Sequence, residues 1–177
     1  NELENVVSIN LTSNYYLTGP WQIDPLNTVI QSVNMDGTGL QFPTGIANKQ
    51  SLKSFSGTYA RSSGPLINLP SVPYVFNNCN ELETLSLYSA TGISGSRFPV
   101  FTNPKLRTLD IRYTGIRGGA PDGDDSNVIH STTFGQAIDL RNIYIDSGSL
   151  LTTPIATNAF SNLQQLYYIW YRSYGRT

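Results

Sequence analysis

The sequence predicts an α/β solenoid, mostly parallel β, in which short strands alternate with irregular connections. The first observation is an L-x-x-L-x-L pattern of apolar residues, which is clearest at Leu82, Leu85 and Leu87. Because strand side chains alternate, the last three residues of the pattern form a short strand with Leu85 and Leu87 on one face. One such strand cannot bury its apolar face alone, so the pattern is expected to repeat.

The second observation is that the pattern recurs along the whole chain. The seven copies begin at Val6, Ile30, Leu52, Leu82, Leu106, Leu140 and Leu166. Successive copies are 22 to 34 residues apart, which fits a repeat of about 20–29 residues with loop insertions in the longer cases. A third observation supports the register, because an apolar residue stands six positions before four of the copies. These residues are Ile46, Phe76, Phe134 and Phe160.

The elements in chain order are therefore seven strands and the connections between them. The third copy is the weakest, because Gly57 supplies no side chain to the core. Every proline lies between the expected strands, as it must, since proline cannot donate to a sheet ladder. The two longest connections, 58–81 and 112–139, are where insertions are expected.

The length of 177 residues suits one domain spanning 1–177. Solenoids need polar caps at both ends, and the first and last copies stand close to the termini with no cap beyond them. Tyr167, Tyr168, Trp170 and Tyr171 crowd the last copy. We therefore expect the chain to be a segment of a longer one.

The stretch from Val75 to Leu82 resembles the A-F-x-x-C-x-x-L unit of irregular leucine-rich repeats in bacterial surface proteins. A second stretch, from Ala159 to Leu166, is similar and has Leu163 at the position of the cysteine. The chain departs from that subtype in keeping only one such cysteine and in its variable repeat lengths. The resemblance implies about seven short parallel strands in a concave sheet, with loops or single helical turns on the convex side.

Composition excludes several classes of function. Charged residues make up 13% of the chain and the net charge is −1, so no general basic field attracts nucleic acid. No apolar run approaches the ~18 residues of a membrane span, and membrane insertion is not expected. Cys79 is the only cysteine, which rules out an internal disulfide and leaves the redox compartment open.

The candidate binding surface consists of outward-pointing residues, in three rows, in the C-terminal half of the expected concave face. Tyr, Trp and Arg are the residue types enriched at binding hot spots, and aromatic faces beside carboxylates also suit sugars. The alternative interpretation is that these aromatics only stabilise neighbouring strands. The predicted partner-binding residues are Tyr88, Asp110, Arg112, Tyr144, Asp146, Tyr168, Trp170 and Arg172.

Other candidate sites are less convincing. Asp122, Asp124 and Asp125 offer oxygen ligands for calcium, but their loop lacks the EF-hand spacing, so a solvated acidic loop is favoured. His130 is the only histidine, which leaves little for a zinc site or a catalytic triad. Cys79 is expected to pack inward. Asp110 and Asp146 remain a conceivable glycosidase pair, although an open face does little to exclude water.

We therefore expect a non-catalytic module with no cofactor, whose partners are proteins of a larger assembly or a host surface protein or glycan. Low charge and abundant Asn, Ser, Thr, Gly and Tyr resemble phage tail, baseplate and fibre proteins, which predicts a virion location. The alternative is an adhesin on the bacterial surface or secreted. A receptor ectodomain ranks third, because the disulfide-bonded caps usual in such ectodomains are absent.

Overall fold

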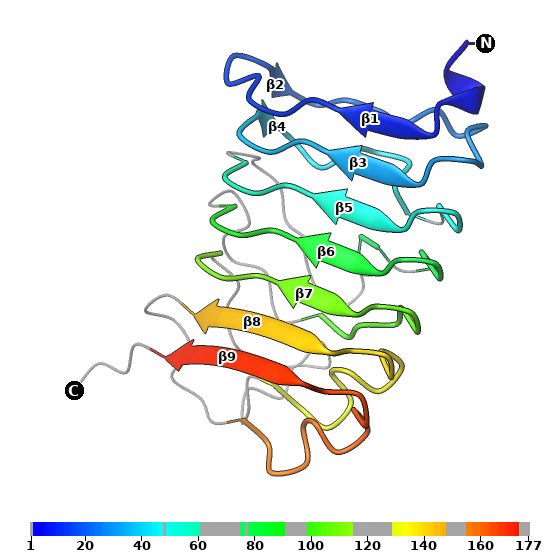
Figure 1. Ribbon diagram of the computed structural model, residues 1–177. Helices are drawn as coiled ribbons and strands as arrows, with labels where there is room; N and C mark the ends of the chain where they lie inside the picture. Colours follow the sequence, from blue (N-terminus) through cyan, green and yellow to red (C-terminus); the bar gives the residue numbers. More distant parts are fainter. Residues whose placement is uncertain are drawn as a thin grey trace.

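A parallel sheet of seven strands runs along the molecule, with one strand from each repeat. The computed structural model describes residues 2–47, 49–60, 75–76, 78–90, 99–114, 129–147 and 155–173. The strands are, in sheet order, β1 (Ser8–Asn10), β3 (Ser32–Asn34), β5 (Ser54–Ser56), β6 (Thr84–Ser86), β7 (Thr108–Asp110), β8 (Asn142–Ser147) and β9 (Tyr168–Ser173). Each strand pairs in parallel with the strand of the next repeat, so the chain is a mostly parallel-β solenoid (Figure 1).

The register of the sheet agrees with the register of the sequence pattern. Val33 pairs with Phe55, and Leu85 pairs with Leu109. Each of these residues is the second apolar position of its copy. The strand boundaries were predicted one residue too late, because β6 covers Thr84–Ser86 rather than 85–87.

The apolar positions of the repeat form the core. In the five central copies these side chains are at most 2% exposed. The third copy lacks a side chain at Gly57, and neighbouring residues close the space. A Cβ at Gly57 would stand 3.5 Å from both Phe55 Cε1 and Leu87 Cδ2, which is ordinary van der Waals contact.

Two tight turns, rather than a helix, lead into β5, β6, β8 and β9. In the fourth repeat the Cys79 N–H donates to the Phe76 carbonyl and the Leu82 N–H donates to the Cys79 carbonyl, both at 3.1 Å. Turns of this kind place every third side chain on one side, which explains why all three residues are buried. The only helical element among the described residues is the 3₁₀ helix η1 (Glu2–Asn5). The described residues therefore contain no α-helix, although the sequence predicted an α/β class.

A row of buried residues stands three positions before the first apolar residue of the second to the seventh repeat. The row comprises Asn27, Lys49, Cys79, Asn103, Ala137 and Leu163. Its polar members bond to the preceding repeat: Lys49 Nζ donates to the Asn27 carbonyl at 2.7 Å. Asn103 Nδ2 donates to the carbonyls of Phe76 and Cys79 at 2.9 and 3.0 Å. These bonds tie successive repeats together through backbone carbonyls of the turns.

A turn with left-handed backbone follows each of the first five strands of this sheet. The residues with positive φ are Ser13, Gly37, Tyr59, Ser89 and Tyr113, at φ from 54° to 69°. The last strand residue starts the turn: Asn34 Oδ1 accepts the Asp36 N–H at 2.9 Å, as in an Asx turn. Tyr144 fills that position in β8 and offers no such acceptor, and β8 continues to Ser147.

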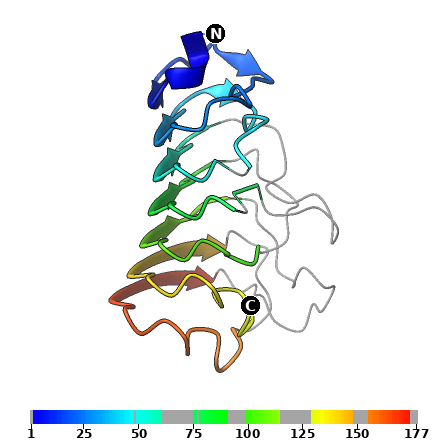
Figure 2. The same ribbon diagram turned by 90° about the vertical axis from the view of Figure 1, so that its right-hand side faces the viewer.

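The described parts of the connections lie on the opposite side of the molecule from the sheet (Figure 2). The first two connections pair as a second parallel sheet of β2 (Thr18–Gly19) and β4 (Gly39–Leu40). Further along, Phe134 stacks between Phe101 and Phe160, with ring centroids 5.5 and 5.7 Å away. Phe134 is therefore both a register marker in the sequence and a core residue in the structure.

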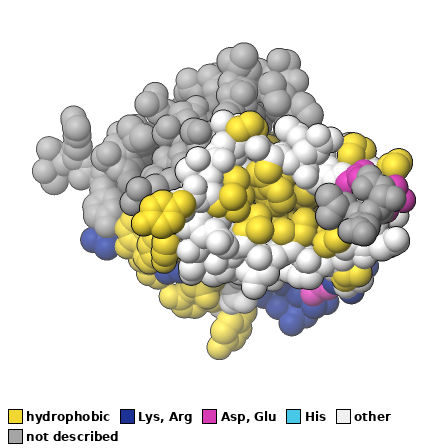
Figure 3. All heavy atoms as spheres, turned by 90° about the horizontal axis from the view of Figure 1, so that it is seen from above, with side chains coloured by type: hydrophobic (Ala, Val, Ile, Leu, Met, Phe, Trp, Pro, Cys, Tyr) yellow, Lys and Arg dark blue, Asp and Glu magenta, His cyan; other side chains and the backbone are white. Residues whose placement is uncertain are grey.

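Core side chains are less covered at both ends of the stack. Val6, Ile9 and Leu11 of the first copy are only partly buried, and Ile169 is 39% exposed on β9. Figure 3 looks onto the β1 end and shows a central group of hydrophobic side chains among backbone atoms and side chains of other types.

Candidate functional site: an aromatic surface around Arg112

Most of the predicted partner-binding residues come together on the outer face of the sheet, the face expected to be concave. Asp110 ends β7 and pairs with Tyr144 of β8, which in turn pairs with Trp170 of β9. Tyr88 and Arg112 lie in the turns that follow β6 and β7. We refer to Tyr88, Asp110, Arg112, Tyr144 and Trp170 as the Arg112 cluster.

Arg112 is held at the centre of the cluster by a forked pair of bonds to Asp110. Nε donates to Asp110 Oδ1 at 2.9 Å and Nη2 donates to Oδ2 at 2.6 Å. The two side chains are only 27% and 13% exposed, respectively. The hydrogen bond to Asp110 is the main cause of a raised pKa for Arg112, against the opposing effect of desolvation. Two-point bonding of this kind fixes the orientation of the guanidinium plane.

Aromatic rings from three other repeats surround the guanidinium. Arg112 Cζ lies 4.8 Å from the ring centroids of Tyr88 and Tyr144, and 5.4 Å from that of Trp170. A cation within about 6 Å of a ring centroid is attracted by the ring quadrupole. Tyr88 belongs to the preceding repeat, and Tyr144 and Trp170 belong to the two that follow. The cluster therefore connects four repeats into one rigid surface.

The aromatic surface extends beyond the cluster in both directions. Tyr59 and Tyr113 meet the Tyr88 ring edge-on, with centroids 5.2 and 5.3 Å away. A side-chain hydrogen bond with Tyr59 is the main cause of a raised pKa for Tyr88. On the other side, Tyr168 lies 5.4 Å from Tyr144 and is 42% exposed. The surface thus runs from the turns after β5, β6 and β7 onto the outer face of β8 and β9.

Sequence reasoning missed Tyr59 and Tyr113. Both occupy the left-handed position of their turns, with φ of 54°. Gly37 holds the equivalent position in the second repeat, and glycine is the residue that this backbone favours. The available signal in the sequence was a bulky residue at the repeat position where the second repeat has glycine. This signal could be recognised only by knowing that a left-handed turn occurs at that position.

The other predicted residues are only partly placed. Arg172 is exposed on β9, and its backbone pairs with Asp146 of β8. The side chain of Asp146 lies outside the described residues, as do Asp122, Asp124 and Asp125 altogether. Both oxygens of Asp110 accept bonds from Arg112, so this carboxylate is committed to an ion pair.

Cys79 packs inward as predicted. It is 0% exposed, and its Sγ donates to the Ile46 carbonyl at 3.4 Å. His130 is half-buried, and its backbone N–H donates to Thr133 Oγ1 at 2.9 Å. Within the described part of the chain, no group of three or more His, Cys, Asp or Glu side chains is placed to hold a metal ion. No helix there has the length and apolar character needed to cross a membrane.

The chain matches no known protein-family model, and no curated protein has a significant sequence match to it. Function is therefore inferred from geometry. The Arg112 cluster is a fixed, largely aromatic surface whose charge pair is internally compensated. Such a surface suits contact with another macromolecule, whereas general acid–base chemistry needs a carboxylate that is free to exchange a proton.

Proposed function

We propose that this chain is a non-catalytic protein-interaction module, in which the Arg112 cluster and the neighbouring Tyr168 contact a protein partner. The observation that carries the proposal is the fixed position of Arg112 between Asp110 and three aromatic rings. Arg, Tyr and Trp dominate binding hot spots. Side chains that are already ordered lose little entropy when a partner binds, which favours affinity on an otherwise open surface.

We also propose that the scaffold is an irregular leucine-rich repeat. The buried Cys79 supports this assignment, because it lies at the inward position of the F-x-x-C-x-x-L unit between the buried Phe76 and Leu82. The parallel register of the L-x-x-L-x-L copies supports it as well. Fold alone does not settle function, so the partner is argued from the surface.

The setting that we propose is a phage virion protein of the tail, baseplate or fibre, with the module serving assembly or host recognition. The support is compositional: few charges and many Asn, Ser, Thr, Gly and Tyr residues. A bacterial surface adhesin is the alternative, and its partner would be a host protein or glycan. Both settings use the same surface.

Site-specific photocrosslinking tests the proposal. A benzophenone amino acid replaces Tyr168, which adjoins the cluster, or Tyr167, which is 88% exposed and outside it. The chain is then expressed in its native source and irradiated. We expect a single cross-linked protein from position 168 and severalfold less from position 167. Mass spectrometry of that protein separates a virion component from a host surface protein.

Two variants complete the test. Tyr144→Ala is expected to weaken binding of the cross-linked protein about 30-fold, as at a hot spot of 2 kcal/mol. Ile138→Ala is the control, because Ile138 is 53% exposed and lies in the connection before β8. Equal cross-linking at positions 167 and 168, or equal binding by the two variants, would contradict the proposed surface.

A further inference from the structure

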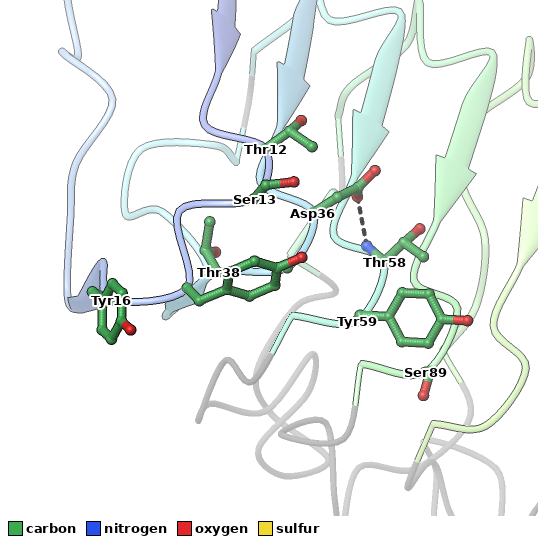
Figure 4. A pocket seen from close by; sticks show the side chains of 10 residues that line it. Thr12, Ser13, Tyr16, Asp36, Thr38, Thr58, Tyr59 and Ser89 are labelled. Atoms are coloured by element: carbon green, nitrogen blue, oxygen red, sulfur yellow. Dashed lines mark hydrogen bonds between the residues drawn. The ribbon is translucent and has the colours of Figure 1, made fainter.

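A second feature lies in the N-terminal half, where the turns after β1, β3, β5 and β6 line a groove of about 950 Å³. The volume is in the range of small-molecule sites, about 300–1,000 Å³. The groove is lined by Thr12, Ser13, Tyr15, Tyr16, Asp36, Gly37, Thr38, Thr58, Tyr59 and Ser89. Tyr16 and Tyr59 lie at opposite ends of it, with Ser13 and Asp36 between them (Figure 4). It shares no residue with the Arg112 cluster.

Asp36 is held with one oxygen bonded and the other available. Its Oδ1 accepts the Ser56 hydroxyl at 2.6 Å and the Thr58 N–H at 2.7 Å. Its Oδ2 accepts no hydrogen bond from the other described residues. The carboxylate is thus oriented by the protein and keeps an acceptor for a hydroxyl or amide of a ligand.

The remaining polar groups are neutral hydroxyls. Neither Ser13 nor Ser89 has a side-chain hydrogen bond with another described residue, so both can donate to and accept from a ligand. Thr58 Oγ1 lies 3.1 Å from Ser86 Oγ, which leaves it further acceptor capacity. Asp36 is the only charged residue among the described lining. Its negative charge disfavours phosphates and acidic sugars.

The groove also offers exposed aromatic faces. Tyr15, Tyr16 and Tyr59 are 69%, 98% and 59% exposed. Gly37 allows the Tyr15 ring to approach the turn closely, because a Cβ there would stand 3.0 Å from Tyr15 Cε1. Tyr59 keeps its ring at the groove in spite of a left-handed backbone that L-residues seldom adopt.

We infer that this groove binds a neutral oligosaccharide. The apolar faces of the sugar rings stack on Tyr59 and on Tyr15, and the ring hydroxyls bond to Asp36 Oδ2, Ser13 and Ser89. Aromatic rings give a broad apolar surface with a specific geometry, and the hydroxyls between them match the alternating donors and acceptors of a sugar. A small quaternary ammonium ion fits less well, since Tyr16 and Tyr59 are separated along the groove and do not enclose one point.

The experiment is binding of the full chain to an array of neutral glycans. Cellohexaose, maltohexaose and chitohexaose, followed by saturation-transfer NMR and calorimetry, provide soluble probes. We expect at least one neutral glycan to bind, and Tyr59→Gly to weaken that binding at least about tenfold, the equivalent of 1.4 kcal/mol. Glycine suits the left-handed turn, so this variant removes the ring without adding backbone strain.

Tyr113→Gly is the matched control. Tyr113 has the same φ of 54° and the same edge-on contact with Tyr88, but it does not line the groove. Its glycan affinity is expected to stay within about twofold of the unmodified chain, and Tyr144→Ala is expected to leave it unchanged. The inference is overturned if no neutral glycan binds, if Tyr59→Gly binds as tightly as Tyr113→Gly, or if acidic glycans or tetramethylammonium compete equally well.

Discussion

Lys49→Met is the substitution that most directly tests how the repeats are held together. Lys49 is 6% exposed, and its Nζ donates to the carbonyls of Asn27 at 2.7 Å, Asp24 at 2.8 Å and Pro25 at 3.3 Å. Methionine has nearly the same length and apolar volume but no donor. The variant therefore removes the bonds between two repeats while preserving the packing of the stem.

The expected loss of stability follows from two opposing terms. Hydrogen bonds to a charged group contribute about 1.5–3 kcal/mol each, so the two shorter ones contribute roughly 3–6 kcal/mol. Burial of the ammonium offsets part of this, and the same desolvation lowers the pKa of Lys49. We expect Lys49→Met to reduce the free energy of unfolding by about 2–4 kcal/mol, or roughly 4–16 °C in Tm for a chain of this size.

Because the pKa of Lys49 is lowered, the loss of stability in the Lys49→Met variant is expected to depend on pH. The unfolded lysine titrates near 10.5, and the folded one titrates below it. Between these two values Lys49 binds more protons in the unfolded chain, so its contribution to the free energy of unfolding rises with pH. Neutral Lys49 still has N–H groups to donate. The stability difference between the unmodified chain and the Lys49→Met variant should therefore grow as pH rises toward 10.5, while tyrosine titrations cancel in the difference.

Urea unfolding followed by circular dichroism, at several pH values from 7 to about 10, measures this difference. Lys105→Met is the control, because Lys105 pairs with Glu81 at the surface, where the side chains are 49% and 40% exposed. A surface pair of this kind contributes at most about 1 kcal/mol. The reasoning fails if Lys49→Met destabilises no more than Lys105→Met, or if the difference shrinks as pH rises.

Two further predictions concern packing and are also measured by urea or thermal unfolding. Gly57→Ala should raise the free energy of unfolding by about 0.4–1 kcal/mol, because its Cβ meets neighbours at 3.5 Å. Gly37→Ala should lower it by roughly 1 kcal/mol or more, since φ is +69° and the Cβ would meet Tyr15 at 3.0 Å. The same sign for both would refute this account. Phe134→Ala should lower the free energy of unfolding by about 3–5 kcal/mol, because its ring stacks between Phe101 and Phe160. A loss below about 1 kcal/mol would show that this stack of three rings contributes little to stability.

The parallel solenoid could be predicted because apolar spacing reports directly on which side chains face inward. Leu82, Leu85 and Leu87 are all fully buried, and so is Phe76, the apolar residue six positions before Leu82. The turns between them could not be predicted, because i→i+3 bonds depend on backbone geometry that residue type only weakly constrains. Buried Lys49 and Asn103 were missed for a related reason. They stand at the same position of the repeat as Cys79, but a polar side chain gives no signal of burial in the sequence.

The residues of the candidate site could be predicted from the sequence, but the contacts between their side chains could not. Period-two alternation placed Asp110, Tyr144 and Trp170 on one face, which the paired register confirms. The sequence offered no way to see that Arg112 turns back onto Asp110, because that contact depends on the Asx turn after β7. The groove could not be predicted from the sequence either, because its lining residues belong to turns of successive repeats that lie far apart in the chain.

The residues at the left-handed position of the turn differ from repeat to repeat, which allows the needs of the fold to be distinguished from those of the surface. Gly37, Ser13 and Ser89 hold that backbone with small side chains, so the fold itself needs nothing larger there. Tyr59 and Tyr113 hold the same backbone with bulky rings, at an expected cost of roughly 1–2 kcal/mol each. Their contacts with Tyr88 recover part of that cost, since an aromatic pair contributes about 0.5–1.5 kcal/mol beyond its buried area. Glycine at either position would relieve the uncompensated strain, so a variant that gains stability and loses a ligand would show that the ring is kept for the ligand.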